Sequence, residues 1–336
     1  MSALPLIDRY GREISYIRLS VTDRCDFRCQ YCMPMNMRFL PKRDILSLDE
    51  LLQVARVFTT LGVKKVRITG GEPLVRKNIV WLCEQIAALD GVREVAITSN
   101  GSQLVKLAKE LAAAGVRRVN ISLDSLVPAR FRELTRTGDL QQVLNGVDAA
   151  LAAGFPGGVK LNTVMMRGFN EDELPTLAKF ALDNGMDISF IEEMPLGDIG
   201  RWRGDTYYSA TEAMPQLQQH FDLTASDYDS GGPARYWQVA GRQNRIGFIT
   251  PHSHNFCSTC NRVRITATGE LYPCLGQNDA SDLKPALRGE DSRRDTSDEA
   301  LRQLIMQVMQ IKPKGHDFDV YAPDAKVIRF MSSTGG

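Results

Sequence analysis

The first two-thirds of the chain alternate between short apolar runs and longer segments with scattered apolar positions. A short apolar run bounded by turn residues is typical of a strand buried on both faces in a parallel sheet. The interval between one run and the next is long enough for a helix. The predicted strands are Ile14–Val21, Val66–Thr69, Val95–Thr98, Val119–Leu123, Val159–Met165 and Ile188–Ile191.

Helix signals fill the intervals between these strands. Ser47 and Glu50 form a capping-box pattern that opens the first helix. Asp139, and Asn170 with Glu173, are placed to cap two later helices. A glycine with positive φ commonly ends a helix, and five predicted helices are each followed by one. These glycines are Gly62, Gly91, Gly115, Gly154 and Gly185.

Strands that alternate with helices indicate a parallel sheet covered by helices. Six strand–helix units suit either an open doubly wound sheet or an incomplete (β/α)6 barrel. No G-x-G-x-x-G pattern follows the first strand, which weakens a dinucleotide-binding interpretation. Polar residues instead end many of the strands, which is where a barrel carries its site. We therefore predict an α/β fold with an incomplete (β/α)6 TIM-like barrel.

The regular alternation stops after Leu196. Short strands are predicted from Tyr236 onward, followed by a helix from about Asp298 to Ile311 and a polar, irregular end. We place a domain boundary near residue 235. Residues 1–235 would form the partial barrel, and residues 236–336 a C-terminal region with a second metal site, a substrate-binding role and a Gly-Gly tail.

Composition narrows the class of protein. The 336 residues carry 41 basic and 40 acidic side chains, so bulk charge gives no reason to expect a nucleic-acid or membrane partner. No apolar run approaches the length of a membrane span, and the N-terminus lacks a secretory signal pattern. We expect a cytoplasmic protein, in which clustered cysteines are metal ligands rather than disulfides. The isolated Cys83 is expected to be a buried hydrophobic residue.

Three cysteines, Cys25, Cys29 and Cys32, directly follow the first predicted strand. Their C-x3-C-x2-C spacing suits an iron–sulfur cluster held by three thiolates, with one iron left open for chemistry. Structural zinc needs four ligands, and no fourth cysteine or histidine is near in the sequence. The spacing therefore favours a [4Fe–4S] cluster over zinc.

A second group, Cys257, Cys260 and Cys274, lies near the end of the chain. The segment from Arg262 to Leu275 is predicted to form a hairpin that returns Cys274 to the first two cysteines. Ligand type alone leaves zinc and a second cluster as equal alternatives, since His252 and His254 are close in sequence. The neighbouring Arg262 and Arg264 suggest an anionic ligand.

The first cysteine group, with Gly70-Gly71-Glu72-Pro73 after the second strand, resembles the radical S-adenosylmethionine superfamily. In that family this GGEP motif receives the methionyl amino group, and Glu72 is suited to accept from an ammonium. The segments Ile17–Cys25 and Phe256–Arg264 and the terminal Gly335-Gly336 are similar to the molybdenum-cofactor branch of the superfamily. This resemblance covers essentially the whole chain.

The resemblance implies two [4Fe–4S] clusters, S-adenosylmethionine as cofactor and GTP as substrate. It further implies the radical cyclisation of GTP to 3′,8-cyclo-7,8-dihydro-GTP, an external one-electron reductant, and a downstream cyclic pyranopterin monophosphate synthase. The chain would be a monomer or a homodimer. Residues matching S-adenosylmethionine contacts are Tyr31, Gly71, Ser122 and Met194. Residues matching GTP contacts are Arg18, Arg67, Thr98, Lys160, Arg262 and Arg264.

Residue chemistry supports this pattern. A buried arginine or lysine on a strand is costly unless it is paired, and a triphosphate would supply that pairing. The adjacent Arg117 and Arg118, by contrast, are expected to lie in a solvated turn. Two alternatives stay open: another radical enzyme with an auxiliary cluster, such as a peptide-modifying one, or a non-catalytic zinc protein that binds nucleic acid.

Overall fold

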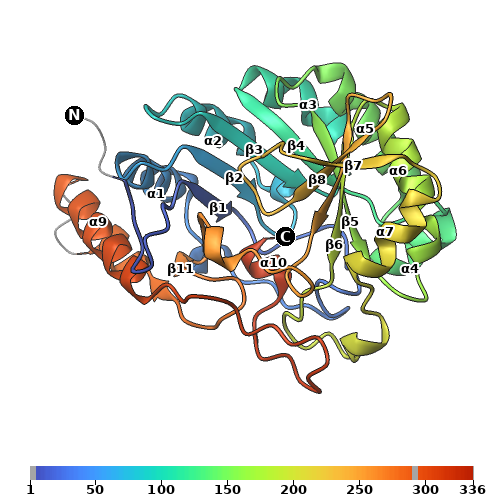
Figure 1. The fold of residues 1–336 in the computed structure, drawn as a ribbon. Helices are drawn as coiled ribbons and strands as arrows, with labels where there is room; N and C mark the ends of the chain where they lie inside the picture. Colours follow the sequence, from blue (N-terminus) through green and yellow to red (C-terminus); the bar gives the residue numbers. More distant parts are fainter. Residues whose placement is uncertain (1–4, 290–293, 336) are drawn as a thin grey trace.

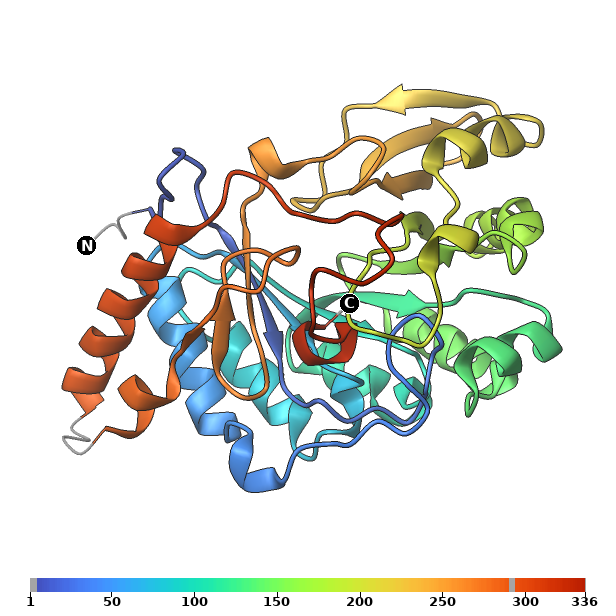
Figure 2. The same cartoon turned by 90° about the horizontal axis from the view of Figure 1, so that it is seen from below.

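The computed structural model describes residues 5–289 and 294–335 and is shown in two views (Figures 1 and 2). The described residues form one central mixed sheet of twelve strands, in the order β12-β11-β10-β1-β2-β3-β4-β5-β6-β9-β8-β7. The strands are β1 Tyr16–Ser20, β2 Lys65–Thr69, β3 Glu94–Ser99, β4 Val116–Ser122, β5 Val159–Met165, β6 Asp187–Glu192, β7 Leu223–Ser226, β8 Arg235–Val239, β9 Arg245–Ile249, β10 Arg262–Ile265, β11 Glu270–Tyr272 and β12 Ser281–Asp282.

The six predicted strands are confirmed as β1 to β6, with boundaries that differ by a few residues at most. These strands are neighbours in chain order, and every pair is parallel. Their carboxyl ends therefore share one edge of the sheet. Because side chains alternate along a strand, every second residue of each strand lies on the same face.

Helices cover the outer face of the curved sheet (Figure 1). Both the Ser47–Glu50 capping box and the Asp139 cap are confirmed, and all five predicted helix-ending glycines have positive φ. The helices are α1 Leu48–Thr60, α2 Ile79–Ala87, α3 Leu104–Ala113, α4 Pro128–Thr135, α5 Leu140–Ala153, α6 Leu174–Asp183, α7 Ala210–Gln218, α8 Lys284–Arg288, α9 Arg294–Ile311 and α10 Met331–Thr334.

The predicted cap of α6 is wrong. Asn170 makes no capping bond; it donates instead to the carbonyls of Asp124 and Val164. Glu173 accepts hydrogen bonds from the Ser125 hydroxyl and from a backbone N–H in the same loop. Both side chains therefore fix the loop after β4, and α6 begins beyond them. Helices α4, α7, α8 and α10 were not predicted.

The C-terminal part of the chain extends the parallel sheet at both edges. Strand β10 pairs parallel with β1, and β9 pairs parallel with β6. The predicted hairpin is confirmed as the antiparallel pair of β10 and β11. Cys83 is fully buried in the hydrophobic core, as predicted. Within residues 5–289 and 294–335, no helix is long and apolar enough to cross a membrane.

Candidate active site

The first cysteine group lies in the loop that leaves β1. The backbone N–H of Cys32 donates to the carbonyl of Cys29 at 3.0 Å, and the N–H of Phe27 lies 3.4 Å from the Cys25 sulfur. These bonds turn the loop so that the three thiols lie close enough to influence one another electrostatically. Burial raises the pKa of all three thiols, that of Cys32 to about 12, although a hydrogen bond from the Ser332 backbone opposes the shift.

This donor set fits an iron–sulfur cluster. A buried thiol with a raised pKa needs a positive partner in order to ionise, and a cluster iron provides one. In the described part of the chain, no three His, Cys, Asp or Glu side chains converge on a position for a single metal ion. Cysteines that bind separate irons of a cubane are not expected to converge in that way.

The GGEP segment packs directly against the chain that leads into this loop. A Cβ at Gly71 would lie 2.4 Å from the carbonyl oxygen of Arg24, and the N–H of Gly71 donates to the carbonyl of Thr22. The glycines thus allow the ends of β1 and β2 to approach each other closely. Glu72 accepts from the backbone N–H groups of Leu74 and Asn100 and from the Ser99 hydroxyl.

Glu72 therefore joins the ends of β2 and β3 through three hydrogen bonds that its carboxylate accepts. Its side chain is buried, and burial raises its pKa to about 7. Its three protein donors leave limited capacity for a further ligand. The positive charge of a methionyl ammonium would still be favourable beside this carboxylate.

The remaining candidate cofactor contacts lie at the ends of other strands. The Tyr31 hydroxyl donates to the carboxylate of Asp124 at 2.9 Å, which fixes the tyrosine ring beside the loop after β4. Ser122 ends β4 itself, and Met194 follows β6 and lines a cavity between β1, β2, β4, β5 and β10, which we call the main cavity. These residues, with Gly71, surround the carboxyl ends of the parallel strands.

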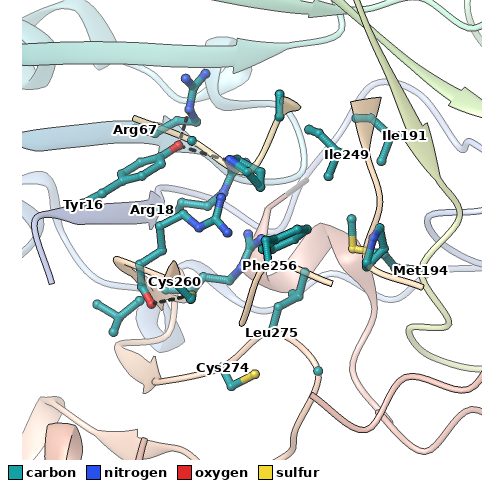
Figure 3. A pocket seen from close by; sticks show the side chains of 18 of the residues that line it. Tyr16, Arg18, Arg67, Ile191, Met194, Ile249, Phe256, Cys260, Cys274 and Leu275 are labelled. Atoms are coloured by element: carbon teal, nitrogen blue, oxygen red, sulfur yellow. Dashed lines mark hydrogen bonds between the residues drawn. The ribbon is translucent and has the colours of Figure 1, made fainter. Parts of the chain in front are cut away.

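The second cysteine group is brought together by the β10–β11 hairpin. Cys257, Cys260 and Cys274 all line the main cavity (Figure 3 labels Cys260 and Cys274). Burial raises the pKa of Cys260, but the charges of Arg262 and Lys312 outweigh this effect and lower it to about 7. The His252 ring instead lies 2.9 Å from the Glu193 carbonyl, so this histidine is engaged elsewhere.

The main cavity is strongly cationic. No Asp or Glu belongs to the lining formed by the described residues. The cations come from β1, β2, β4, β5 and β10, and are Arg18, Lys65, Arg67, Arg118, Lys160, Arg262 and Arg264. Register explains why they gather: Arg264, Arg18 and Arg67 are directly opposite one another on three adjacent strands.

Several of these cations lack a counter-charge. Within the described residues, Nε and Nη2 of Arg18 have no hydrogen-bond partner. Arg67 donates to the Tyr16 hydroxyl at 2.6 Å, and Lys160 donates to the Tyr236 hydroxyl at 2.8 Å (Arg18, Arg67 and Tyr16 are drawn in Figure 3). Burial and the charge of Arg67 lower the pKa of Lys160 to about 7. Such a cavity is suited to a polyanion.

Five of the six predicted GTP residues line this cavity; the exception is Thr98, whose hydroxyl accepts a hydrogen bond from Arg67 at 3.3 Å. Sequence reasoning missed Tyr16 and Lys65, and it misplaced Arg118. Burial raises the pKa of Tyr16, but the surrounding cations outweigh burial and lower it to about 7. Arg118 faces the cavity from β4, whereas Arg117 is exposed. Strand alternation was the signal that would have separated them.

The end of the chain lies inside the curve of the sheet (Figure 2). Arg264 donates to the carbonyl of Gly335 at 2.7 Å, and a Cβ at Gly335 would lie 2.2 Å from a side-chain atom of Thr69. At the other end of the same segment, the Ser332 backbone lies near Cys32 and lowers the pKa of its thiol against the effect of burial. Residues 332–335 therefore connect the first cysteine group to the cationic cavity. Gly336 lies outside the described residues.

The fold and the two cysteine groups define the class, a radical S-adenosylmethionine protein. Residues 19–181 match the Radical SAM superfamily, and residues 186–318 match the family described as Molybdenum Cofactor Synthesis C. The chain is similar in fold to Streptococcus suis SuiB bound to S-adenosylmethionine, with a TM-score of 0.59 and 16% identity over 97% of this chain and 79% of SuiB.

Other relatives share more than half of their sequence with this chain over nearly its whole length. The chain is 55% identical to the GTP 3′,8-cyclase of Pseudomonas entomophila (strain L48), over 98% of each protein. It is 51% identical to the GTP 3′,8-cyclase of Saccharophagus degradans, again over 98% of each. The chain therefore belongs to the GTP 3′,8-cyclase family. S-adenosylmethionine and two [4Fe–4S] clusters are the cofactors of this family, in accord with the two cysteine groups.

Proposed function

We propose that this protein converts GTP into (8S)-3′,8-cyclo-7,8-dihydroguanosine 5′-triphosphate, the first step of molybdenum cofactor biosynthesis. One observation carries the proposal: a single cavity combines the second cysteine group with seven strand-borne cations and no carboxylate among the described lining residues. A nucleoside triphosphate has both parts that this cavity would recognise. Its phosphates suit the cations, and its base suits an open iron position.

The cations of the sheet hold the triphosphate in this proposal. Arg18 has free guanidinium nitrogens, and Arg67 and Lys160 donate only to hydroxyl or carbonyl groups in the described structure. A polyanion removes the mutual repulsion of these side chains and completes their hydrogen bonds. Lys65 takes part as well, since it lines the same cavity. Thr98 orients the Arg67 guanidinium.

Arg262 and Arg264 hold the substrate near the second cluster. Both lie on β10, directly after Cys260, and both line the cavity. Arg264 also donates to Gly335, so this arginine couples the substrate site to the C-terminal segment. Cys257, Cys260 and Cys274 would hold the second cluster with three thiolates, and its open iron position would suit the guanine base.

S-adenosylmethionine binds at the first cluster, held by Cys25, Cys29 and Cys32, with Tyr31, Gly71, Ser122 and Met194 as its contacts in this proposal. When bound, these two groups supply the radical chemistry that removes a hydrogen atom from C3′ of GTP and so forms the C3′–C8 bond. Tyr31 is held by Asp124 and defines one wall of the site. The chain contributes positioning and exclusion of water, and the cofactors contribute the reactivity.

The proposal also covers the division of the chain into two regions. We interpret β1 to β6 and their helices as an incomplete (β/α)6 barrel within residues 1–235, and residues 236–336 as the region that carries the second cluster and much of the substrate site. The reaction needs an external one-electron reductant. The product would pass to a cyclic pyranopterin monophosphate synthase.

Anaerobic reconstitution and product analysis test this function. The protein should bind about eight irons if both cysteine groups hold cubanes. Incubation with GTP, S-adenosylmethionine and a reductant should yield 5′-deoxyadenosine and a product with the mass of GTP. The hydrogen atom that C3′ loses to 5′-deoxyadenosine is replaced by one electron from the reductant and one proton. Zinc at both sites, or 5′-deoxyadenosine formation that does not respond to GTP, would refute the proposal.

A peptide-modifying radical enzyme is the competing interpretation, because SuiB shares the fold. At 16% identity that likeness concerns the fold alone. A cavity lined by seven cations fits a triphosphate better than an unmodified peptide backbone, which carries no net charge. Competition of GTP with inorganic triphosphate for the cavity would support the nucleotide interpretation directly.

A further inference from the structure

Lys312 is a buried cation beside the second cysteine group, and the proposed function gives this side chain no role. It follows α9, and only 1% of its surface is exposed. Its ammonium donates to the carbonyls of Pro273 at 2.6 Å and Arg262 at 2.9 Å, and it lies 3.7 Å from the sulfur of Cys260. An ammonium has three N–H donors, and these three contacts account for all of them.

Among residues 5–289 and 294–335, no carboxylate pairs with Lys312. Its hydrogen bonds go to two carbonyls and one sulfur, and in the described residues it takes part in no ion pair. Burial of an ammonium costs several kcal/mol unless an anion compensates for it. The Cys260 sulfur is the group in contact that can carry a negative charge. A thiolate bound to an anionic iron–sulfur cluster would supply the missing counter-charge.

Two neighbouring arginines show what is particular to this lysine. Arg12 donates to the carbonyls of Cys257 at 2.8 Å and Pro313 at 2.6 Å. Arg329 donates to the carbonyl of Cys274 at 3.2 Å. Both arginines fix the backbone around the cysteines. Only Lys312, of these three cations, has a hydrogen-bond contact with a cysteine sulfur.

We propose that Lys312 is a positioning residue of the second cluster, which donates an N–H···S hydrogen bond to Cys260 and raises the reduction potential of that cluster. The inference rests on the cluster assigned to Cys257, Cys260 and Cys274 under the proposed function. Reduction adds one negative charge to a cluster, so a nearby ammonium stabilises the reduced state more than the oxidised state. Hydrogen bonds to the sulfurs and net charge are established determinants of cluster potential.

The test measures the potential of the second cluster in the full chain. Replacing Cys25, Cys29 and Cys32 with alanine removes the first cluster and leaves one paramagnetic centre to titrate. In this background, Lys312→Met keeps the length and packing of the side chain but removes its charge and its donors. Lys314→Met is the matched control, since Lys314 is exposed two residues further along. Anaerobic redox titration followed by electron paramagnetic resonance gives the midpoint potentials.

We expect Lys312→Met to lower the midpoint potential of the second cluster by about 59 mV, for a one-electron couple. At the wild-type midpoint, the ratio of reduced to oxidised cluster would then be about tenfold lower. The Lys314→Met midpoint should be unchanged. If Lys312→Met cannot hold the cluster, Lys312→Gln gives the measurement, because it keeps donors for the two carbonyls without the charge. An unchanged midpoint with a full complement of iron would overturn the inference. Loss of the second cluster from both Lys312 variants would also overturn it, in favour of a purely structural lysine.

Failure of the proposed function gives a different result in the same experiment. The Cys25, Cys29 and Cys32 background with Lys312 intact should bind about four irons. Absence of iron from that protein would refute the second cluster itself. Presence of iron without a Lys312 effect would refute only the role of the lysine.

Discussion

Replacement of Lys160 by methionine should make the nucleotide-free protein more stable while weakening GTP binding. Lys160 is 5% exposed on β5, and burial with the charge of Arg67 lowers its pKa to about 7. In an unfolded chain the lysine pKa is about 10.4. At 1.36 kcal/mol for each pKa unit, the folded protein is destabilised by about 4 kcal/mol at pH 7 through this side chain. Methionine fills a similar volume without a charge.

The free energy of unfolding should depend on pH in the wild type and not, through this side chain, in Lys160→Met. Between about pH 7 and pH 10 the unfolded chain keeps a proton on Lys160 that the folded protein releases, so the stability of the wild type should rise with pH. Below pH 7 both states are charged, and the penalty is constant. Lys160→Met should lack this rise. The two proteins should therefore differ most in stability at or below pH 7 and converge toward pH 10.

The charged form of Lys160 should strengthen GTP binding, although the same charge destabilises the nucleotide-free protein. Phosphate oxygens favour the charged ammonium, so GTP affinity should increase as pH falls from 9 to 7 and binding should take up protons. Loss of one charged hydrogen-bond partner costs about 1.5–3 kcal/mol, which corresponds to a dissociation constant roughly 10- to 150-fold higher for Lys160→Met. Calorimetry in two buffers of different ionisation enthalpy measures affinity and proton uptake together.

Chemical denaturation of the nucleotide-free protein from pH 6 to pH 10 measures the stability part. Lys109→Met, at an exposed position of α3, is the matched control and should change neither quantity. Two outcomes would refute the reasoning. One is a Lys160→Met protein that is less stable than the wild type by several kcal/mol at pH 7. The other is GTP affinity equal to that of the wild type across the pH range.

Three further substitutions test other parts of the site. Cys25→Ala should remove about four irons and abolish 5′-deoxyadenosine formation, whereas Cys83→Ala should do neither; wild-type yield in Cys25→Ala would contradict the assignment of the first cluster. Arg18→Met should raise the dissociation constant for GTP roughly 10- to 150-fold with both clusters intact, because its free guanidinium nitrogens are available to phosphate; unchanged affinity would exclude such a role. Gly335→Ala should displace the end of the chain from β2 and reduce GTP turnover with iron content unchanged, while Gly241→Ala, which has a similar positive φ but open space around it, should leave turnover normal. Equal turnover in the two glycine variants would show that the position of the chain end is unimportant.

Local patterns predicted the strands of this fold well. Each of β1 to β6 is a short apolar run, and tertiary packing does not conflict with that signal. The Ser47–Glu50 capping box is confirmed, and the Glu50 carboxylate bonds to the Ser47 backbone while it also pairs with Arg288. Asn170 and Glu173 have similar spacing, but their side chains bond to the loop after β4. Sequence spacing does not reveal such competing tertiary partners.

The candidate site was only partly predictable. Both cysteine groups are visible as spacings, but the contacts of Lys312 and Gly335 depend on the path of the chain after α9. Arg118 was assigned to a turn although it lies on β4 and faces the cavity. Register could not be predicted either, and it is register that sets Arg18, Arg67 and Arg264 side by side.

The pairing of β10 with β1 has a consequence for how the protein is made. During synthesis β1 emerges early, but its partner on one side, Arg262–Ile265, emerges only near the end of translation. Until then, Tyr16–Leu19 is an exposed sheet edge, which is prone to pair with other chains. Contacts of such long sequence separation also form slowly. The first strand therefore completes its pairing only after the segment that carries Cys257 and Cys260 has been made.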